Sequence, residues 1–242
     1  MREKVRQILG IAVLNGKFIQ RQPLWIFQGF IMACGFAVTL FFWGGNAALR
    51  NLVIAYFITG GWGLGLNTVA QIIGWNRVQL LYDFYVASPV TLPMYFVGTI
   101  LGSMPLFITS VIPATIIAII LEMDFSFIIP IILLAATSAV IGQFTSLSVI
   151  LRLKKPTNIS AITNPLYVFT TILPPVYYPL TFISPILRPF ILIVPTASLM
   201  ELSRWFAGVP IATNVVFPLI STISWLILTT ILVAKKLRWG LE

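Results

Sequence analysis

Residues 94–121, MYFVGTILGSMPLFITSVIPATIIAIIL, form an apolar stretch without a charged side chain. Because about 20 such residues in a helix cross the hydrocarbon core of a bilayer, this stretch predicts a membrane-spanning helix. Five further stretches meet the same criterion, namely residues 24–43, 51–74, 127–151, 160–183 and 210–234. Together they leave no room for a soluble domain, so we expect residues 1–242 to form one all-α membrane domain with six transmembrane helices.

The composition of the whole chain agrees with a lipid environment. Hydrophobic residues make up 59% of the 242 residues and charged residues only 9%, whereas a soluble domain carries about 25% charged residues. The net charge of +9 at pH 7 comes from bases that lie outside the apolar stretches, so it indicates membrane topology and not nucleic-acid binding. The chain has no histidine, which excludes His-dependent nucleophilic, metal and proton-transfer sites within it.

The basic residues also predict the orientation of the chain. With the N-terminus in the cytoplasm, twelve bases fall on the inner side of the membrane and three on the outer side, as the positive-inside rule requires. The inner group comprises Arg2, Lys4, Arg6, Lys17, Arg21, Arg77, Arg152, Lys154, Lys155, Lys235, Lys236 and Arg238. The outer group comprises Arg50, Arg188 and Arg204. We therefore expect a multi-pass protein with both termini in the cytoplasm.

Residues 1–22 carry a helical pattern outside the predicted spans. Apolar side chains recur at the spacing of one helix face, at Val5, Ile8, Leu9, Ala12 and Val13. This pattern predicts an amphipathic helix that lies in the plane of the inner membrane surface. A basic segment that serves only as a topology signal is the alternative.

The loop between the second and third spans carries a second helical pattern. Val78, Leu81, Tyr82 and Tyr85 share one face of a short helix. The helix should end before Ser88-Pro89, because the residue before a proline avoids the α region. An aromatic, apolar face in a cytoplasmic loop needs a surface to dock on, and the pattern alone leaves the inner leaflet and a partner protein equally open.

Residues 179–204 form a third stretch that does not span. Its apolar run, residues 182–195, is interrupted by Pro185 and Pro189 with Arg188 between them, and each proline removes a backbone donor. The run is also too short to cross. A re-entrant or outer-surface helical hairpin that caps the outer mouth is therefore the prediction.

None of the six predicted spans contains Asp, Glu, Lys or Arg. Because proton-coupled carriers use a titratable residue within the membrane, that class is disfavoured. Sodium coupling stays open, since Asn67 or Asn164 could supply ligands. The chain also lacks a phosphate-binding loop, so ATP-driven transport would require another chain.

Two pairs of glycines at four-residue spacing occur within the spans. They are Gly61 with Gly65 in the second span, and Gly98 with Gly102 in the third. Such spacing lets helix backbones approach closely. The sequence leaves open whether the contact forms within the chain or between two copies.

The order of these parts resembles that of the permease subunits of type-2 ABC exporters. Residues 80–90, LLYDFYVASPV, are similar to the coupling segment of that family. Residues 179–204, which include Pro185, Leu187-Arg188-Pro189 and the Glu201–Arg204 pair, are similar to its outer segment. The sequence departs from the family pattern at residues 74–77, a less charged approach to the coupling segment, and at Val194, where the family has Asn.

The resemblance implies six transmembrane helices with an in-plane N-terminal helix, a cytoplasmic coupling helix and an outer re-entrant hairpin before the last span. It also implies that two copies, as a homodimer in the lipid bilayer, pair with ATP-binding cassette ATPase subunits. Those subunits would bind ATP and Mg²⁺, while this chain would hold no catalytic site, cofactor or metal. A half-size permease without its own ATPase points to a prokaryotic plasma membrane.

The resemblance assigns residues to three roles. Contacts that couple the chain to the ATPase are expected from Arg77, Val78, Leu81, Tyr82, Asp83, Tyr85, Ser88 and Pro89. A substrate path between two copies is expected to be lined by Tyr56, Asn67, Tyr167, Phe169 and Thr170. An outer gate is expected from Pro185, Arg188, Pro189, Glu201 and Arg204.

The aromatic-rich spans favour a hydrophobic drug, a lipid or a similar compound as the exported substrate. Two other classes remain alternatives: a self-contained carrier or channel without an ATPase, which could be sodium-linked, and a structural or assembly protein. A membrane enzyme is disfavoured, because no paired intramembrane carboxylates, metal ligands or activated nucleophile occur in the sequence.

Overall fold

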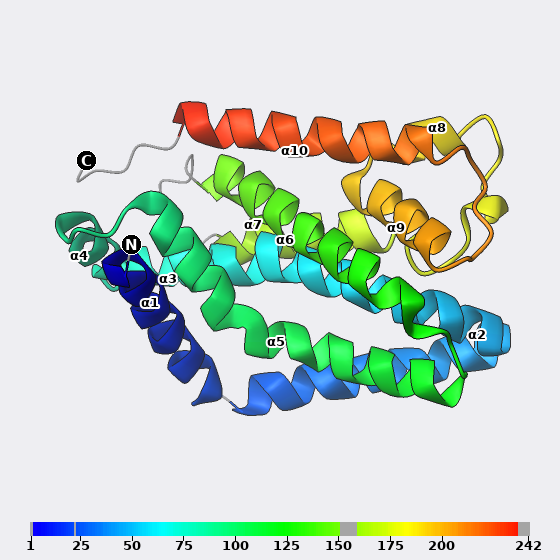
Figure 1. The fold of residues 1–242 in the computed structure, drawn as a ribbon, viewed down its shortest axis with the longest axis horizontal. Helices are drawn as coiled ribbons and strands as arrows, with labels where there is room; N and C mark the ends of the chain where they lie inside the picture. Colours follow the sequence, from blue (N-terminus) through cyan, green and yellow to red (C-terminus); the bar gives the residue numbers. More distant parts are fainter. Residues whose placement is uncertain (1, 22, 151–158, 237–242) are drawn as a thin grey trace.

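The computed structural model describes residues 2–21, 23–150 and 159–236, and within these ranges every regular element is helical. Four of the described helices are long and apolar enough to cross a membrane. The chain is therefore a multi-pass helical membrane protein, and the predicted all-α class is confirmed. Figure 1 shows the long helices running along the bundle, with α1 (Arg2–Gln20) set across one end of it.

The first long helix, α2 (Pro23–Gly63), consists of two antiparallel halves. Gly45 has φ 58° and ψ −149°, a conformation that other residues rarely adopt. The chain reverses there, since the Tyr56 hydroxyl donates to the Ala33 carbonyl on the opposite side of the turn. Figure 1 shows the returning half beside the first. The first two predicted spans thus form a helical hairpin whose turn lies between them.

Three further long helices match predicted spans to within a few residues, apart from the start of the last. They are α5 (Leu92–Ile120), α6 (Ile128–Ile150) and α10 (Val216–Lys236). The last begins at Val216 and not at residue 210, because Asn214 caps it by accepting a hydrogen bond from the Val216 amide at 3.0 Å. Leu151, the end of the predicted fourth span, lies outside the described residues.

The fifth predicted span, residues 160–183, is longer than the helix that forms. Helix α7 covers only Ile159–Thr171 and is not among the four helices long enough to cross. The adjacent Pro174 and Pro175 lack amide donors, so the helix cannot continue through them. The chain turns there, with the Val176 amide donating to the Pro174 carbonyl.

A 3-10 turn, η4 (Leu180–Phe182), and two short α-helices follow in the stretch predicted to form an outer hairpin. The helices are α8 (Arg188–Ile191) and α9 (Pro195–Phe206), and each has a proline in its first turn, where a missing donor costs nothing. Helix α9 is buried from Pro195 to Arg204. It packs against α2, α6, α7 and α10, so it is an internal part of the bundle.

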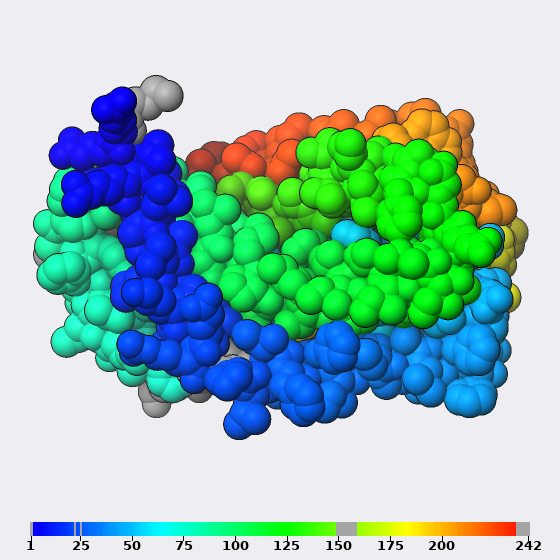
Figure 2. Space-filling view, turned by 60° about the horizontal axis from the view of Figure 1, so that its bottom comes forward, coloured from blue at the N-terminus to red at the C-terminus, as the bar shows by residue number. Residues whose placement is uncertain are grey.

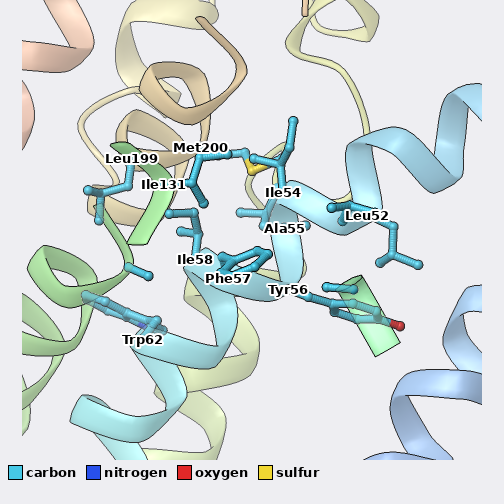
Figure 3. Close-up of a cluster of buried hydrophobic side chains, with 14 of the residues drawn as sticks. Leu52, Ile54, Ala55, Tyr56, Phe57, Ile58, Trp62, Ile131, Leu199 and Met200 are labelled. Carbon is cyan, nitrogen blue, oxygen red and sulfur yellow. The ribbon is translucent and has the colours of Figure 1, made fainter. Parts of the chain in front are cut away.

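The core is centred on the returning half of α2. Figure 3 shows Phe57 and Trp62 of this half with Ile131 of α6 and Leu199 and Met200 of α9. Because lipid is as apolar as these side chains, close packing and not water exclusion favours their association in a membrane.

The glycine pair of the second predicted span, Gly61 and Gly65, makes a close helix contact within this core. A Cβ atom would lie 2.3 Å from the Ala135 carbonyl oxygen if added to Gly61, and 1.9 Å from that of Ala139 if added to Gly65. Only glycine permits α2 to approach the backbone of α6 this closely. The Gly61–Gly65 contact is therefore made within the chain.

Helix α1 packs on α5 through the other glycine pair. Ile11, Asn15 and Ile19 are buried in this contact, and a Cβ added to Gly102 would meet the Ala12 carbonyl oxygen at 2.6 Å. Figure 2 shows α1 laid across the end of the bundle.

Only part of the apolar face predicted for residues 1–22 is covered by α5, and the rest is exposed. Ile8 and Ala12 are partly covered, whereas Val5, Leu9 and Val13 remain exposed on α1. The exposed part is free to contact lipid, as an in-plane helix would.

The bases sort to two ends of the bundle. Helix α1, helix α4 (Leu81–Ala87) and the last turn of α10 lie at one end, and the Gly45 turn and α8 lie at the other (Figure 1). The first end carries the described members of the predicted inner group. Arg152, Lys154, Lys155 and Arg238 of that group lie outside the described residues. Which end faces the cytoplasm stays a prediction.

Candidate functional site

The predicted coupling segment forms a tip at the end of the bundle that α1 shares. Helix α3 (Ala70–Val78) is followed by Leu80, which has φ 60°, and by α4. A left-handed conformation is costly for a bulky residue. Helix α4 ends before Ser88-Pro89 as predicted, with Ser88 extended at φ −92° and ψ 166°. The Ser88 hydroxyl closes the last turn by donating to the Tyr85 carbonyl at 2.7 Å.

The tyrosines of the predicted coupling face lie against the bundle. Tyr85 is buried, and the ring centroids of Tyr85 and Tyr82 lie 5.1 Å and 6.2 Å from that of Tyr95 on α5. The Arg77 guanidinium sits 5.0 Å from the centre of the Tyr82 ring, within range of a cation–π interaction. Burial raises the pKa of the Tyr85 hydroxyl. These contacts hold α4 on α5.

A different set of side chains is exposed at this end. Leu80, Leu81 and Phe84, here called the tip surface, project from the bundle with Leu80 68% and Phe84 73% exposed. Val78 and Asp83 are exposed beside them, as is Pro89. The predicted face did not include Leu80 and Phe84. The left-handed turn at Leu80 ends one helix at Val78 and starts another at Leu81, so residues on either side of it do not follow a single helical spacing.

Three of the predicted substrate-path residues are engaged within the chain. Tyr56 is buried in the α2 hairpin. Tyr167 lies beside Tyr177. The Thr170 hydroxyl accepts a hydrogen bond from the Trp62 indole at 2.7 Å. None of the three lines the cavity around Asn67.

The other two predicted path residues lie on different surfaces. Phe169 is 61% exposed on α7, with Val168 exposed beside it and Ile172 and Leu173 exposed just after the helix ends. Asn67 instead lines a cavity of about 680 Å³. A single chain therefore does not bring the five residues together, and a path between two copies stays a prediction.

The cavity around Asn67 is large enough to hold a ligand. Its volume falls within the usual range for ligand pockets, roughly 300–1,000 Å³. The wall is built from α1, the start of α2, the π-helical turn η1 (Leu64–Val69) and α3, with one residue each from α4 and α5. Side chains in this wall include Leu14, Asn15, Lys17, Phe18, Arg21, Gln28, Met32, Asn67, Thr68, Gln71, Ile72, Trp75, Asn76, Gln79, Leu81 and Leu106.

Asn67 is held in a fixed orientation at this wall. Its side-chain oxygen accepts hydrogen bonds from the Gln71 amide at 2.6 Å and the Thr163 hydroxyl at 3.0 Å. It lies in η1, and π-helical turns occur frequently at functional sites. The sequence identified Asn67 as polar within a span, but no pattern showed that the helix widens there.

Two of the predicted outer-gate residues form a buried ion pair. Arg204 is 1% exposed and its guanidinium lies 2.5 Å from the Glu201 carboxylate. Arg204 also donates to the Asn51 side chain at 2.8 Å and to the carbonyls of Pro175, Val176 and Tyr178. The Glu201 carboxylate accepts a further bond from the Ala212 amide. This Arg204 network joins α2, α9, the turn after α7 and the loop before α10.

The remaining outer-gate residues lie in a second group. Arg188 is half-buried and donates to the carbonyls of Ile183 at 3.0 Å, Ala212 at 3.4 Å and Thr181 at 3.4 Å. Pro185 and Pro189 flank it and are exposed. Arg188 thus fastens the chain around α8, and the gating role of both groups stays a prediction.

Within the described parts of the chain, no three His, Cys, Asp or Glu side chains gather as metal ligands would. The chain matches no protein-family model, no curated protein and no solved structure.

Proposed function

We propose that the chain is the transmembrane permease subunit of a type-2 ABC exporter. Two copies would form the substrate path and each would dock on a separate ATP-binding subunit, which supplies ATP and Mg²⁺. The observation that carries the proposal is the tip surface, where Leu80, Leu81 and Phe84 stand exposed beyond the long helices. Clusters of exposed apolar side chains mark interaction sites.

The contacts behind the tip surface support a coupling role. Tyr82 and Tyr85 hold α4 on Tyr95 near the start of α5. A partner that moved α4 would therefore also move α5, which runs along the bundle toward its opposite end. The left-handed Leu80 adds support, since backbone strain concentrates at functional sites and persists only where the surrounding structure enforces it.

Other features fit an exporter driven from outside the chain. No acid or base lies in the predicted spans, so the driving force has no titratable group to act on there. The exposed face of α7 around Phe169 is apolar and would line a path between two copies for a hydrophobic compound or lipid. We place the protein in a prokaryotic plasma membrane, with α1 and the tip in the cytoplasm.

Phe84→Asp is expected to reduce the amount of ATPase that copurifies with the tagged chain by about tenfold or more. An aromatic anchor at the centre of an interface is worth about 2 kcal/mol or more, and an aspartate would have to be buried without a partner. Copurification from the native host in mild detergent, with mass spectrometry to identify the ATPase, measures the effect. Phe182→Asp is the matched control, because Phe182 is 78% exposed at the opposite end.

Leu80→Gly is expected to weaken ATPase retention while leaving the thermal transition of the chain unchanged or higher. Glycine adopts the left-handed conformation without the cost that leucine bears, so the loss of binding would not come from misfolding. Retention equal to that of the unaltered chain in both tip variants would contradict the docking assignment. A solitary chain that moved substrate in liposomes without nucleotide would favour the self-contained carrier.

A further inference from the structure

The cavity beside Asn67 has a chemistry that the proposed ATPase coupling does not use. We propose that it binds a membrane lipid with an anionic headgroup. The proposal concerns a bound lipid and stands whether or not the chain works with an ATPase. It rests on three properties of the wall.

The first property is the charge of the wall. Lys17 and Arg21 lie one helical turn apart at the end of α1, where the Arg21 amide donates to the Lys17 carbonyl at 3.1 Å. Both side chains are exposed, and no carboxylate occurs among the described lining residues. A phosphate at this position would therefore meet two positive charges and no carboxylate of the described wall.

The second property is a set of side-chain amides. The Asn67 side-chain oxygen already accepts hydrogen bonds from Gln71 and Thr163. A ligand in the cavity would therefore meet the N–H groups of this amide, which are hydrogen-bond donors. Gln28 and Gln79 add further amides to the wall. Such groups suit the phosphate and ester oxygens of a lipid headgroup.

The third property is an apolar wall that continues onto the outside of the bundle. Phe18, Met32, Ile72 and Leu106 line the cavity, and Phe18 is 46% and Met32 65% exposed. In Figure 2, α1 and the first half of α2 follow one another along this side of the molecule. A headgroup at Lys17 and Arg21 would therefore leave its acyl chains against Met32.

Two other ligands fit this wall less well. A soluble anion such as inorganic phosphate would match the cations but leave the apolar wall uncovered. A zwitterionic lipid would cover the apolar wall but bring a positive group close to the two cations. An anionic lipid matches all three properties.

Native mass spectrometry of the full chain from mild detergent tests the proposal. Phosphatidylglycerol and phosphatidylcholine with the same acyl chains are the probes. The unaltered chain is expected to retain a single phosphatidylglycerol in preference to phosphatidylcholine. Lys17→Gln with Arg21→Gln should reduce that preference by about tenfold or more. Lys4→Gln with Arg6→Gln removes the same charge from exposed positions of α1 outside the cavity and should leave the preference unchanged.

A variant that fills the cavity separates binding inside it from attraction to the surface. Ile72→Trp should lower phosphatidylglycerol retention with no change in charge, and Ile108→Trp, at a position of α5 that is 48% exposed, should not. Thermal transitions establish whether the variants are folded. If Ile72→Trp does not fold, the Lys17 and Arg21 variant decides whether the lipid binds in the cavity. Equal losses from the two charge pairs, undiminished binding to folded Ile72→Trp, or displacement of the lipid by millimolar inorganic phosphate would each overturn the proposal.

Discussion

Replacing Arg204 by Met is expected to destabilise the folded chain by about 3–5 kcal/mol, the usual cost of breaking a buried ion pair. The substitution leaves the Glu201 carboxylate buried without its partner at 2.5 Å. It also removes the donor to the Asn51 side chain and to three backbone carbonyls after α7. Denaturant unfolding of the purified protein in mild detergent, followed by circular dichroism, measures the loss.

A second variant separates the charge from the other bonds of the network. Arg204→Met combined with Glu201→Leu should recover part of the lost stability, because no unpaired charge then remains. Recovery should be incomplete, since the carbonyls of Pro175 and Tyr178 still lack their donor, whereas that of Val176 keeps the Asn51 amide. Arg50→Met is the control, because Arg50 is exposed on α2. A double variant no more stable than the single one would show that the Glu201 charge is not the source of the cost.

Gly65→Ala is expected to destabilise the chain by about 3 kcal/mol, at the upper end of the range for overpacking. The added Cβ would lie 1.9 Å from the Ala139 carbonyl oxygen and 2.7 Å from the Gln143 amide nitrogen. Both are backbone atoms, so no side chain can move aside and α6 must shift. The shift would also stretch the bond from the Ser138 hydroxyl to the Ile58 carbonyl, now 3.0 Å. The same unfolding measurement applies.

Gly35→Ala provides the matched control for this substitution. Gly35 lies in the first half of α2, and a Cβ there would meet nothing within 4 Å. Alanine in an open helical position stabilises by about 0.5–1 kcal/mol relative to glycine. Equal effects at Gly35 and Gly65 would mean that helix propensity and not helix approach determines the result.

Hydropathy was enough to find the long helices, because a span is a local property of about 20 residues. Residues 94–121 became α5 (Leu92–Ile120) almost without change. The end of α4 at Ser88-Pro89 could also be predicted, since the effect of a proline on the preceding residue is local. The same local reading overestimated α7, because Pro174 and Pro175 contribute little to hydropathy and yet end the helix.

The parts that the sequence could not provide depend on distant neighbours or on a single backbone angle. Arg204 binds Asn51, which lies 153 positions away, and no local pattern connects them. The tip surface depends on the left-handed conformation of Leu80, which returns Tyr82 and Tyr85 to the bundle and leaves Phe84 outside. The cavity exists only because α1 folds across α5 beside the widened turn at Asn67.

The turn η1 gives the chain tolerance to a change in length at one place. A π-helical turn closes each hydrogen-bonded ring with one residue more than an α-helix, so it can hold an extra residue without rotating the helices on either side. The helix before the turn can therefore keep Gly61 against Ala135 of α6 while the segment after it keeps Tyr85 against Tyr95 of α5. A deletion within Leu64–Val69 would return the turn to α-helix and keep both alignments, at the expense of the wall around Asn67. The same deletion within α3 would rotate the tip by about 100°, so between Gly61 and Val78 the turn is the place where a change in length preserves both helix contacts.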